Sequence, residues 1–154
     1  MTIPRNLATF AKYSGTQTTP VFSIPNAGET ATASATAATG TIAYDVLTQS
    51  VLYYTSNATG NWTVNFRGNS TTTMNSFMST GQSVAVVFAV TNGGSAFYNS
   101  AVQVDGTTSG VTTIWQGGTA PTAGNASSVD TYTYNIVKTG SATYTVFAAL
   151  TQFK

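Results

Sequence analysis

The stretch DTYTYNIVK, residues 130–138, alternates large apolar side chains with small polar ones. Its even positions from Tyr132 to Ile136 are aromatic or aliphatic, whereas the odd positions between them are Thr and Asn. Because successive side chains of an extended chain point to opposite faces, this period of two predicts a β-strand with one buried face.

The same alternation recurs along the chain. Residues 61–67, NWTVNFR, place Trp62 and Phe66 on one face, and residues 142–150, ATYTVFAAL, repeat the pattern. Residues 83–91, SVAVVFAVT, are apolar at both odd and even positions, which predicts a central strand that is covered on both faces.

Short turn sequences rich in Gly, Asn and Asp separate these runs, and KTGS at residues 138–141 is typical of a hairpin turn. Further strands are expected at residues 40–46, 51–55, 96–105 and 111–115. The sequence therefore predicts one all-β domain, an antiparallel β-sandwich that is jelly-roll-like.

One segment breaks the alternation. Residues 71–81, TTTMNSFMSTG, carry Met74, Phe77 and Met78 at helical spacing, between a Thr or Asn cap and a Gly stop. They predict one short helix or turn that closes an end of the sandwich, with Met and Phe as core filler. Residues 29–40, ETATASATAATG, alternate too weakly to choose between an edge strand and a linker.

Charged residues are scarce: the chain has five basic and four acidic residues, with no His and no Cys. The scattered basic residues form no patch for several phosphates, which argues against nucleic acid and anionic membranes as partners. The four carboxylates lie far apart in sequence, so they indicate no acid–base pair. We therefore expect no enzyme activity, no metal site and no cofactor. Without a run of about 18 apolar residues or an apolar leader, the sequence indicates a soluble, unprocessed product.

The first 28 residues differ from the rest because they lack alternation. Their apolar side chains include Ile3, Leu7, Phe10 and Tyr13. Such a segment is either a frayed terminus or an arm that orders against a partner, and the apolar residues favour the arm. Pro4 would reduce the entropy lost on ordering, and Arg5 would supply one charged contact. We expect residues 1–28 to form a docking arm and residues 29–154 to form the β-sandwich domain.

The C-terminal part of the chain carries a more specific pattern. Residues 114–153 combine a Trp, a Gly-Gly-x-x-Pro turn, a Ser-x-Asp entry into a Tyr/Thr strand and a final aromatic strand. In this combination they resemble the C-terminal segment of virion structural proteins, decoration or fibre-like, of marine tailed phages, including cyanophages. The STGQSV lead at residues 79–84 and the opening MTIPRNLATFA are similar to the same proteins.

In that resemblance the turn WQGGTAP is architectural. Trp115 would end a strand with a large buried side chain. Gly117 and Gly118 would allow a tight reversal, and Pro121 would close the loop before the last hairpin. Trp62 is also expected to pack in the core, with stacking of either Trp on a sugar as the alternative.

The expected function is that of a non-enzymatic virion structural protein. It would be a capsid decoration or head-fibre protein on the exterior of the particle, attached by its arm to the major capsid protein or to tail proteins. The sequence shows no heptads or repeats for a shaft, which favours decoration over a tail-fibre or receptor-binding component that recognises a host glycan. The missing export signal disfavours a third class, a secreted adhesin or pilus-like subunit. Neutral Tyr/Thr strands also predict a homo-oligomer, with a trimer favoured.

Overall fold

The computed structural model describes residues 28–154, which form nine strands, one short helix and one 3-10 turn. The strands are β1 (Ala31–Ala37), β2 (Gly40–Asp45), β3 (Val51–Ser56), β4 (Trp62–Arg67), β5 (Ser83–Asn92), β6 (Asn99–Val104), β7 (Val111–Trp115), β8 (Ser128–Gly140) and β9 (Thr143–Phe153). The helix is α2 (Met74–Phe77), and the turn η1 (Gln116–Gly118) follows β7. The expected arm residues Ile3, Pro4, Arg5, Leu7, Phe10 and Tyr13 lie outside the described residues.

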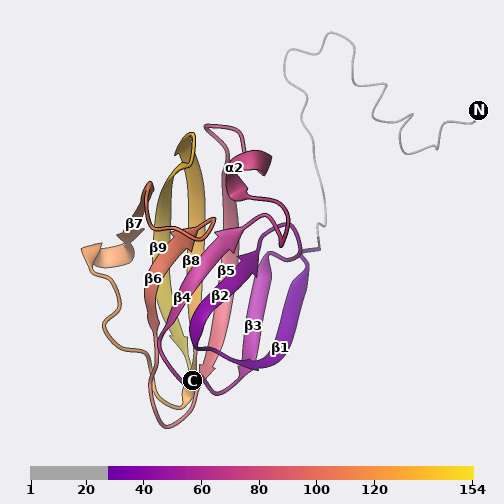
Figure 1. The fold of residues 1–154 in the computed structure, drawn as a ribbon. Coiled ribbons are helices and arrows are strands. Elements are labelled where there is room, and N and C mark those ends of the chain that lie inside the picture. Colours follow the sequence, from indigo (N-terminus) through magenta and orange to yellow (C-terminus); the bar gives the residue numbers. More distant parts are fainter. Residues whose placement is uncertain (1–27) are drawn as a thin grey trace, which may run out of the picture.

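The strands form two sheets that face each other across one core (Figure 1). One sheet has six strands in the order β1-β3-β5-β8-β9-β7, and the other has three in the order β2-β4-β6. The all-β class expected from the sequence is confirmed. The hairpin expected at KTGS joins β8 to β9, and residues 29–40 contribute an edge strand, β1.

The expectation of an antiparallel sandwich is wrong for most strand pairs, and a jelly-roll winding is not confirmed. From β1 to β6 the chain passes alternately between the two sheets, so that neighbours within each sheet run parallel. The three-stranded sheet is wholly parallel, and only the β5–β8 and β8–β9 pairs are antiparallel. A strand that returns through the opposite sheet keeps its direction, whereas a hairpin reverses it. Alternation within one strand does not distinguish these two connections.

Aromatic side chains from both sheets fill the core. Phe66 of β4 packs on Tyr134 of β8 with ring centroids 5.0 Å apart. Trp62 of β4 packs on Tyr132 of β8 at 5.7 Å. All four rings are buried, as the alternation of residues 61–67 and 130–138 predicts. In the described part of the chain no strand pairing joins the two sheets, so this packing holds them together.

The short helix closes one end of the strands, as expected, although it is only four residues long. The Asp105 carboxylate accepts hydrogen bonds from the backbone N–H groups of Met74 and Asn75, at 2.7 and 3.0 Å. At the other end of the helix, the Lys138 ammonium donates to the carbonyl oxygens of Asn75 and Met78, at 2.6 and 2.8 Å. Opposite charges thus satisfy the unpaired backbone groups at the two ends of α2.

Trp115 differs from Trp62 in its burial. The Trp115 ring packs edge-on against Tyr132 and Tyr134, each with centroids 6.3 Å apart, but the side chain is only partly buried. The expected full burial is therefore wrong for Trp115, because β7 is an edge strand and leaves one flank of the ring open. Trp62 lies on the central strand of its sheet and is fully buried.

The two tryptophans should differ in their contribution to stability. We expect Trp62→Ala to lower the free energy of unfolding by about 3–5 kcal/mol, because it leaves a large cavity between the sheets. Trp115→Ala should cost clearly less, because part of its surface is already in water. Urea unfolding of both variants checks this, and equal losses would contradict the difference in burial.

A second comparison concerns the buried tyrosine hydroxyls. The Tyr44 hydroxyl donates toward the carbonyl oxygens of Ser50 and Val87, at 2.7 and 3.0 Å. The Tyr134 hydroxyl is buried without a hydrogen-bond partner among residues 28–154. We expect Tyr44→Phe to destabilise the domain by about 0.5–1.5 kcal/mol, because it removes the hydrogen bonding of the hydroxyl. The Ser50 carbonyl oxygen still accepts from the backbone N–H of Val87 at 2.8 Å, which limits the loss. Tyr134→Phe should be neutral or stabilising, and thermal unfolding of the two variants measures the contrast.

The same residues predict a loss of stability at alkaline pH. Burial raises the pKa of Tyr44, Tyr132 and Tyr134, and it raises the pKa of Tyr144 to about 12. The unfolded chain releases these protons near pH 10, whereas the folded domain retains them. Their contribution is therefore complete below about pH 10 and decreases as the pH rises beyond it. Urea unfolding on either side of that pH measures the slope, which Tyr134→Phe should reduce; a constant stability across this range would overturn the prediction.

Candidate interaction surface

The outer face of the six-stranded sheet carries no charged side chain. Tyr132 and Tyr134 point into the core, so the residues between them on β8 point outward, and the strand register extends this assignment to the neighbouring strands. The outward residues are Ala31, Ala33, Val51, Tyr53, Thr55, Ser83, Ala85, Val87, Ala89, Thr91, Thr112, Ile114, Val129, Thr131, Thr133, Asn135, Val137, Thr145, Phe147, Ala149, Thr151 and Phe153.

The sheet does contain charges, but they point inward. Asp130 and Lys138 are the two charged residues of its six strands, and both are buried. Lys138 caps α2, whereas the Asp130 carboxylate accepts hydrogen bonds from the Asn92 side chain at 3.1 Å and from the Asn125 side chain at 2.7 Å. The Asn125 backbone N–H adds a third bond to Asp130, at 2.9 Å. These charges therefore stabilise the loops at the ends of β8 and leave the outer face neutral.

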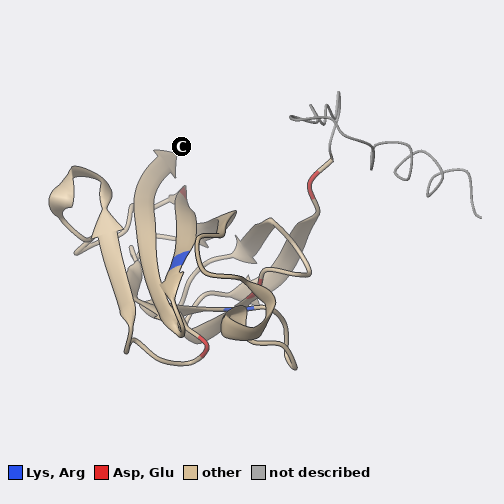
Figure 2. Cartoon of the chain, turned by 90° about the horizontal axis from the view of Figure 1, so that it is seen from above, with Lys and Arg blue, Asp and Glu red and all other residues tan. Residues whose placement is uncertain are grey.

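The three-stranded sheet has the opposite character. Asp45 of β2 and Arg67 of β4 lie in register and form an ion pair, with Oδ1 of Asp45 2.5 Å from Nε of Arg67. This hydrogen bond raises the pKa of the Arg67 guanidinium. Both side chains are about one-third exposed, as suits a face that meets water. Figure 2 shows few blue and red positions along residues 28–154.

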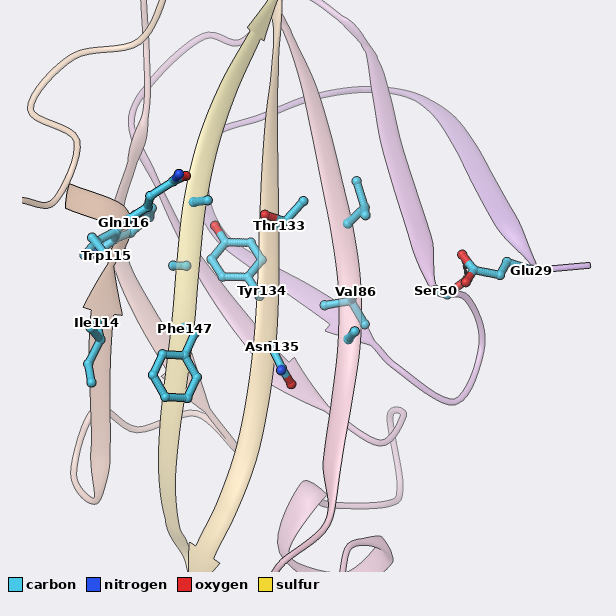
Figure 3. Close-up of a pocket in the computed structure, with 14 residues that line it drawn as sticks. Glu29, Ser50, Val86, Ile114, Trp115, Gln116, Thr133, Tyr134, Asn135 and Phe147 are labelled. Carbon is cyan, nitrogen blue, oxygen red and sulfur yellow. Dashed lines mark hydrogen bonds between the residues drawn. The ribbon is translucent and has the colours of Figure 1, made fainter. Parts of the chain in front are cut away.

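A hollow of about 470 Å³ lies on the outer face of the six-stranded sheet (Figure 3). One register row across it is Ala85, Asn135, Phe147 and Ile114, and the next is Val87, Thr133 and Ala149. Glu29 and Ser50 stand at one end, where the Ser50 hydroxyl donates to the Glu29 carboxylate at 3.2 Å. Gln116, which follows β7, stands at the other end.

The hollow has two unlike halves. On the β7–β9 side, Ile114 and Phe147 are large apolar residues with 47% and 49% of their surface exposed. On the β5 side, Ala85 and Val87 are smaller. A ridge of two large side chains therefore lies beside a floor of small ones. Apolar side chains with amide and hydroxyl groups between them can bind a partner through shape and hydrogen bonding.

The carboxylates of the described chain are each engaged separately. Asp45 pairs with Arg67, Asp105 caps α2, Asp130 binds Asn92 and Asn125, and Glu29 accepts from Ser50. Residues 28–154 contain no cluster of three or more His, Cys, Asp or Glu that could hold a metal ion. Within the same residues, no helix is long and apolar enough to cross a membrane.

The structure separates the residues that the sequence analysis grouped as architectural. Trp62 lies in the core, whereas Trp115 lines the hollow from β7. Gly117 and Gly118 lie in η1, directly after β7, with φ values of 75° and 80°, which glycine adopts without strain. Pro121 lies in the following loop, beside a second hollow that it shares with Trp115 and Leu150.

Sequence reasoning missed the row from Ala85 to Ile114, because its members come from four different strands. One signal was present: Phe147 occupies the position in residues 142–150 where alternation would place a polar residue. A large apolar side chain at an outward position indicates a covered face. No family model, no curated protein and no solved structure matches this chain.

Proposed function

We propose that this chain is a non-enzymatic structural protein of a virion, a capsid decoration or head-fibre protein on the exterior of a phage particle. The observation that carries the proposal is the neutral outer face of the six-stranded sheet. Its outward residues are Ala, Val, Thr, Ser, Asn, Tyr, Phe and Ile, without one charge. The resemblance of residues 79–84 and 114–153 to phage virion proteins supplies the class.

A neutral face of this size suits lasting contact with protein. Solvated sheet surfaces and edges are normally kept apart from other molecules by charged side chains, especially Lys. Here the two charged residues of the sheet, Asp130 and Lys138, are buried and hydrogen-bonded inside the domain. Large apolar residues are exposed instead, among them Phe147 and Phe153. A protein that works as one of many packed copies benefits from such a surface.

Attachment to the particle is assigned to residues 1–28. Their apolar residues, which include Leu7 and Phe10, would pack on the major capsid protein or on a tail protein, and Arg5 would add one charged contact. Among residues 28–154, the core is built from residues 38–150, and the proposal leaves the arm for docking. The same role includes assembly as a homo-oligomer, with a trimer favoured.

A second candidate function is a tail-fibre or receptor-binding component for a host glycan. The partial burial of Trp115 favours it, because Trp115 and Phe147 are both among the residues that line a hollow with Asn135 and Thr133. Aromatic rings with nearby amides and hydroxyls are suited to sugar rings. Copy number separates the two candidates: hundreds of copies per particle indicate the head, and fewer than about twenty indicate the tail, by analogy with closed symmetric assemblies.

The arm provides the direct test. Deleting residues 1–27 should leave a folded domain whose melting temperature is close to that of the full chain, because residues 28–154 supply an aromatic and aliphatic core between the two sheets. The truncated chain should fail to enter particles when it replaces the full chain during assembly. Quantitative mass spectrometry of purified particles, against the major capsid protein, measures incorporation and copy number together.

Three outcomes would count against this proposal. If the full chain is absent from purified particles, the virion role is wrong. If the truncated chain enters particles normally, attachment lies on the domain. If it fails to fold, residues 1–27 belong to the core.

A further inference from the structure

We infer that the outer face of the six-stranded sheet is the surface through which copies of this chain associate, with a second copy covering the hollow between β5 and β7. The inference rests on the proposed structural role only in that it names the surface of the homo-oligomer. Three observations support it: the strand register that defines the outward residues, the absence of charge among those residues, and the large and small side chains that lie side by side on this face.

The size of the face matches a stable contact. Six strands of five to thirteen residues, spaced by about 4.8 Å and rising about 3.3 Å per residue, present a plane of roughly 800 Å². A specific protein interface covers about 800 Å² on each partner. The outer face therefore has about the area that one partner contributes to such an interface, which the two neighbours in a ring of three would share, and none of its outward residues would bring a charge into the contact.

Because the outer face has no charge, a second copy of this chain is the partner that fits it best. A basic or acidic partner would find no opposite charge on this face, since Glu29 stands only at the end of the hollow and accepts a bond from Ser50. A neutral face with apolar residues is instead complementary to itself. The three-stranded sheet, with its Asp45–Arg67 ion pair, has the character of the face that stays in water.

The large and small side chains on this face allow two copies to interlock. The ridge of Ile114 and Phe147 and the floor of Ala85 and Val87 lie on one face but on different strands. A closed ring of three requires each copy to offer two different patches, because a single self-matching patch closes as a dimer. The ridge of one copy against the floor of the next supplies this pair of patches.

A matched pair of alanine substitutions tests the surface. Ala85 on β5 and Ala43 on β2 are both exposed strand residues, one on the outer face of each sheet. We expect the full chain to sediment as an oligomer, a trimer, at micromolar concentration. Ala85→Lys should shift it to monomer, because the ammonium would be buried without a partner, whereas Ala43→Lys should leave the oligomer unchanged.

Phe147→Lys tests the ridge in the same way, and it should also yield monomer. The melting temperature of each lysine variant, taken at a concentration where the wild type is dissociated, shows that the domain still folds. A monomeric wild-type chain would overturn the inference. So would an oligomer that both Ala85→Lys and Phe147→Lys leave intact, because another surface would then join the copies. Neither result bears on incorporation into particles, which separates this test from that of the virion role.

Discussion

The contact between the inner face of β8 and the aromatic residues of β4 is the interaction on which the rest of the structure depends. Tyr132 and Tyr134 meet Trp62 and Phe66 across the core, and among residues 28–154 no strand pairing joins the sheets. The strand that makes this contact also carries Thr133 to the outer face, in the middle of the hollow. Packing that holds the sheets together therefore also positions the candidate interaction surface.

The two charged residues of β8 lie in the interior of the domain, whereas charged side chains usually lie at the surface. Asp130 and Lys138 bound the alternating stretch of β8, and both are taken into the interior, where hydrogen bonds satisfy them. Buried charges are tolerated only with such partners, because an unpaired one would lose its hydration without compensation. The two residues thus connect β8 to the helix at one of its ends and to the loop around Asn125 at the other.

The sequence predicts which side chains face the core better than it predicts which strands lie side by side. Alternation correctly buries Tyr132, Ile136 and Phe66, and the positive φ values at Gly117 and Gly118 follow from glycine chemistry. Strand order was missed because a period of two is the same for parallel and antiparallel neighbours. The row from Ala85 to Ile114 depends on that order, so it could not be assembled from the chain alone. Trp115 is only partly buried for the same reason, since its strand proved to be an edge.

Burial of Lys138 and pairing of Arg67 also bear on resistance to proteolysis. Trypsin-like enzymes cleave after Lys or Arg and need several residues of extended, accessible chain around the cleaved bond. Between residues 28 and 153 the only such positions are Arg67, which lies in β4 beside Asp45, and Lys138, whose ammonium is enclosed by the carbonyl groups of α2. Lys138 lies within β8, and Arg67 is the last residue of β4, where its carbonyl oxygen accepts a hydrogen bond from the backbone N–H of Val46 at 3.0 Å. Nicking concentrates instead at exposed loop tips. Within residues 28–153, the folded domain therefore holds both positions in hydrogen-bonded strands, which should slow cleavage by such enzymes.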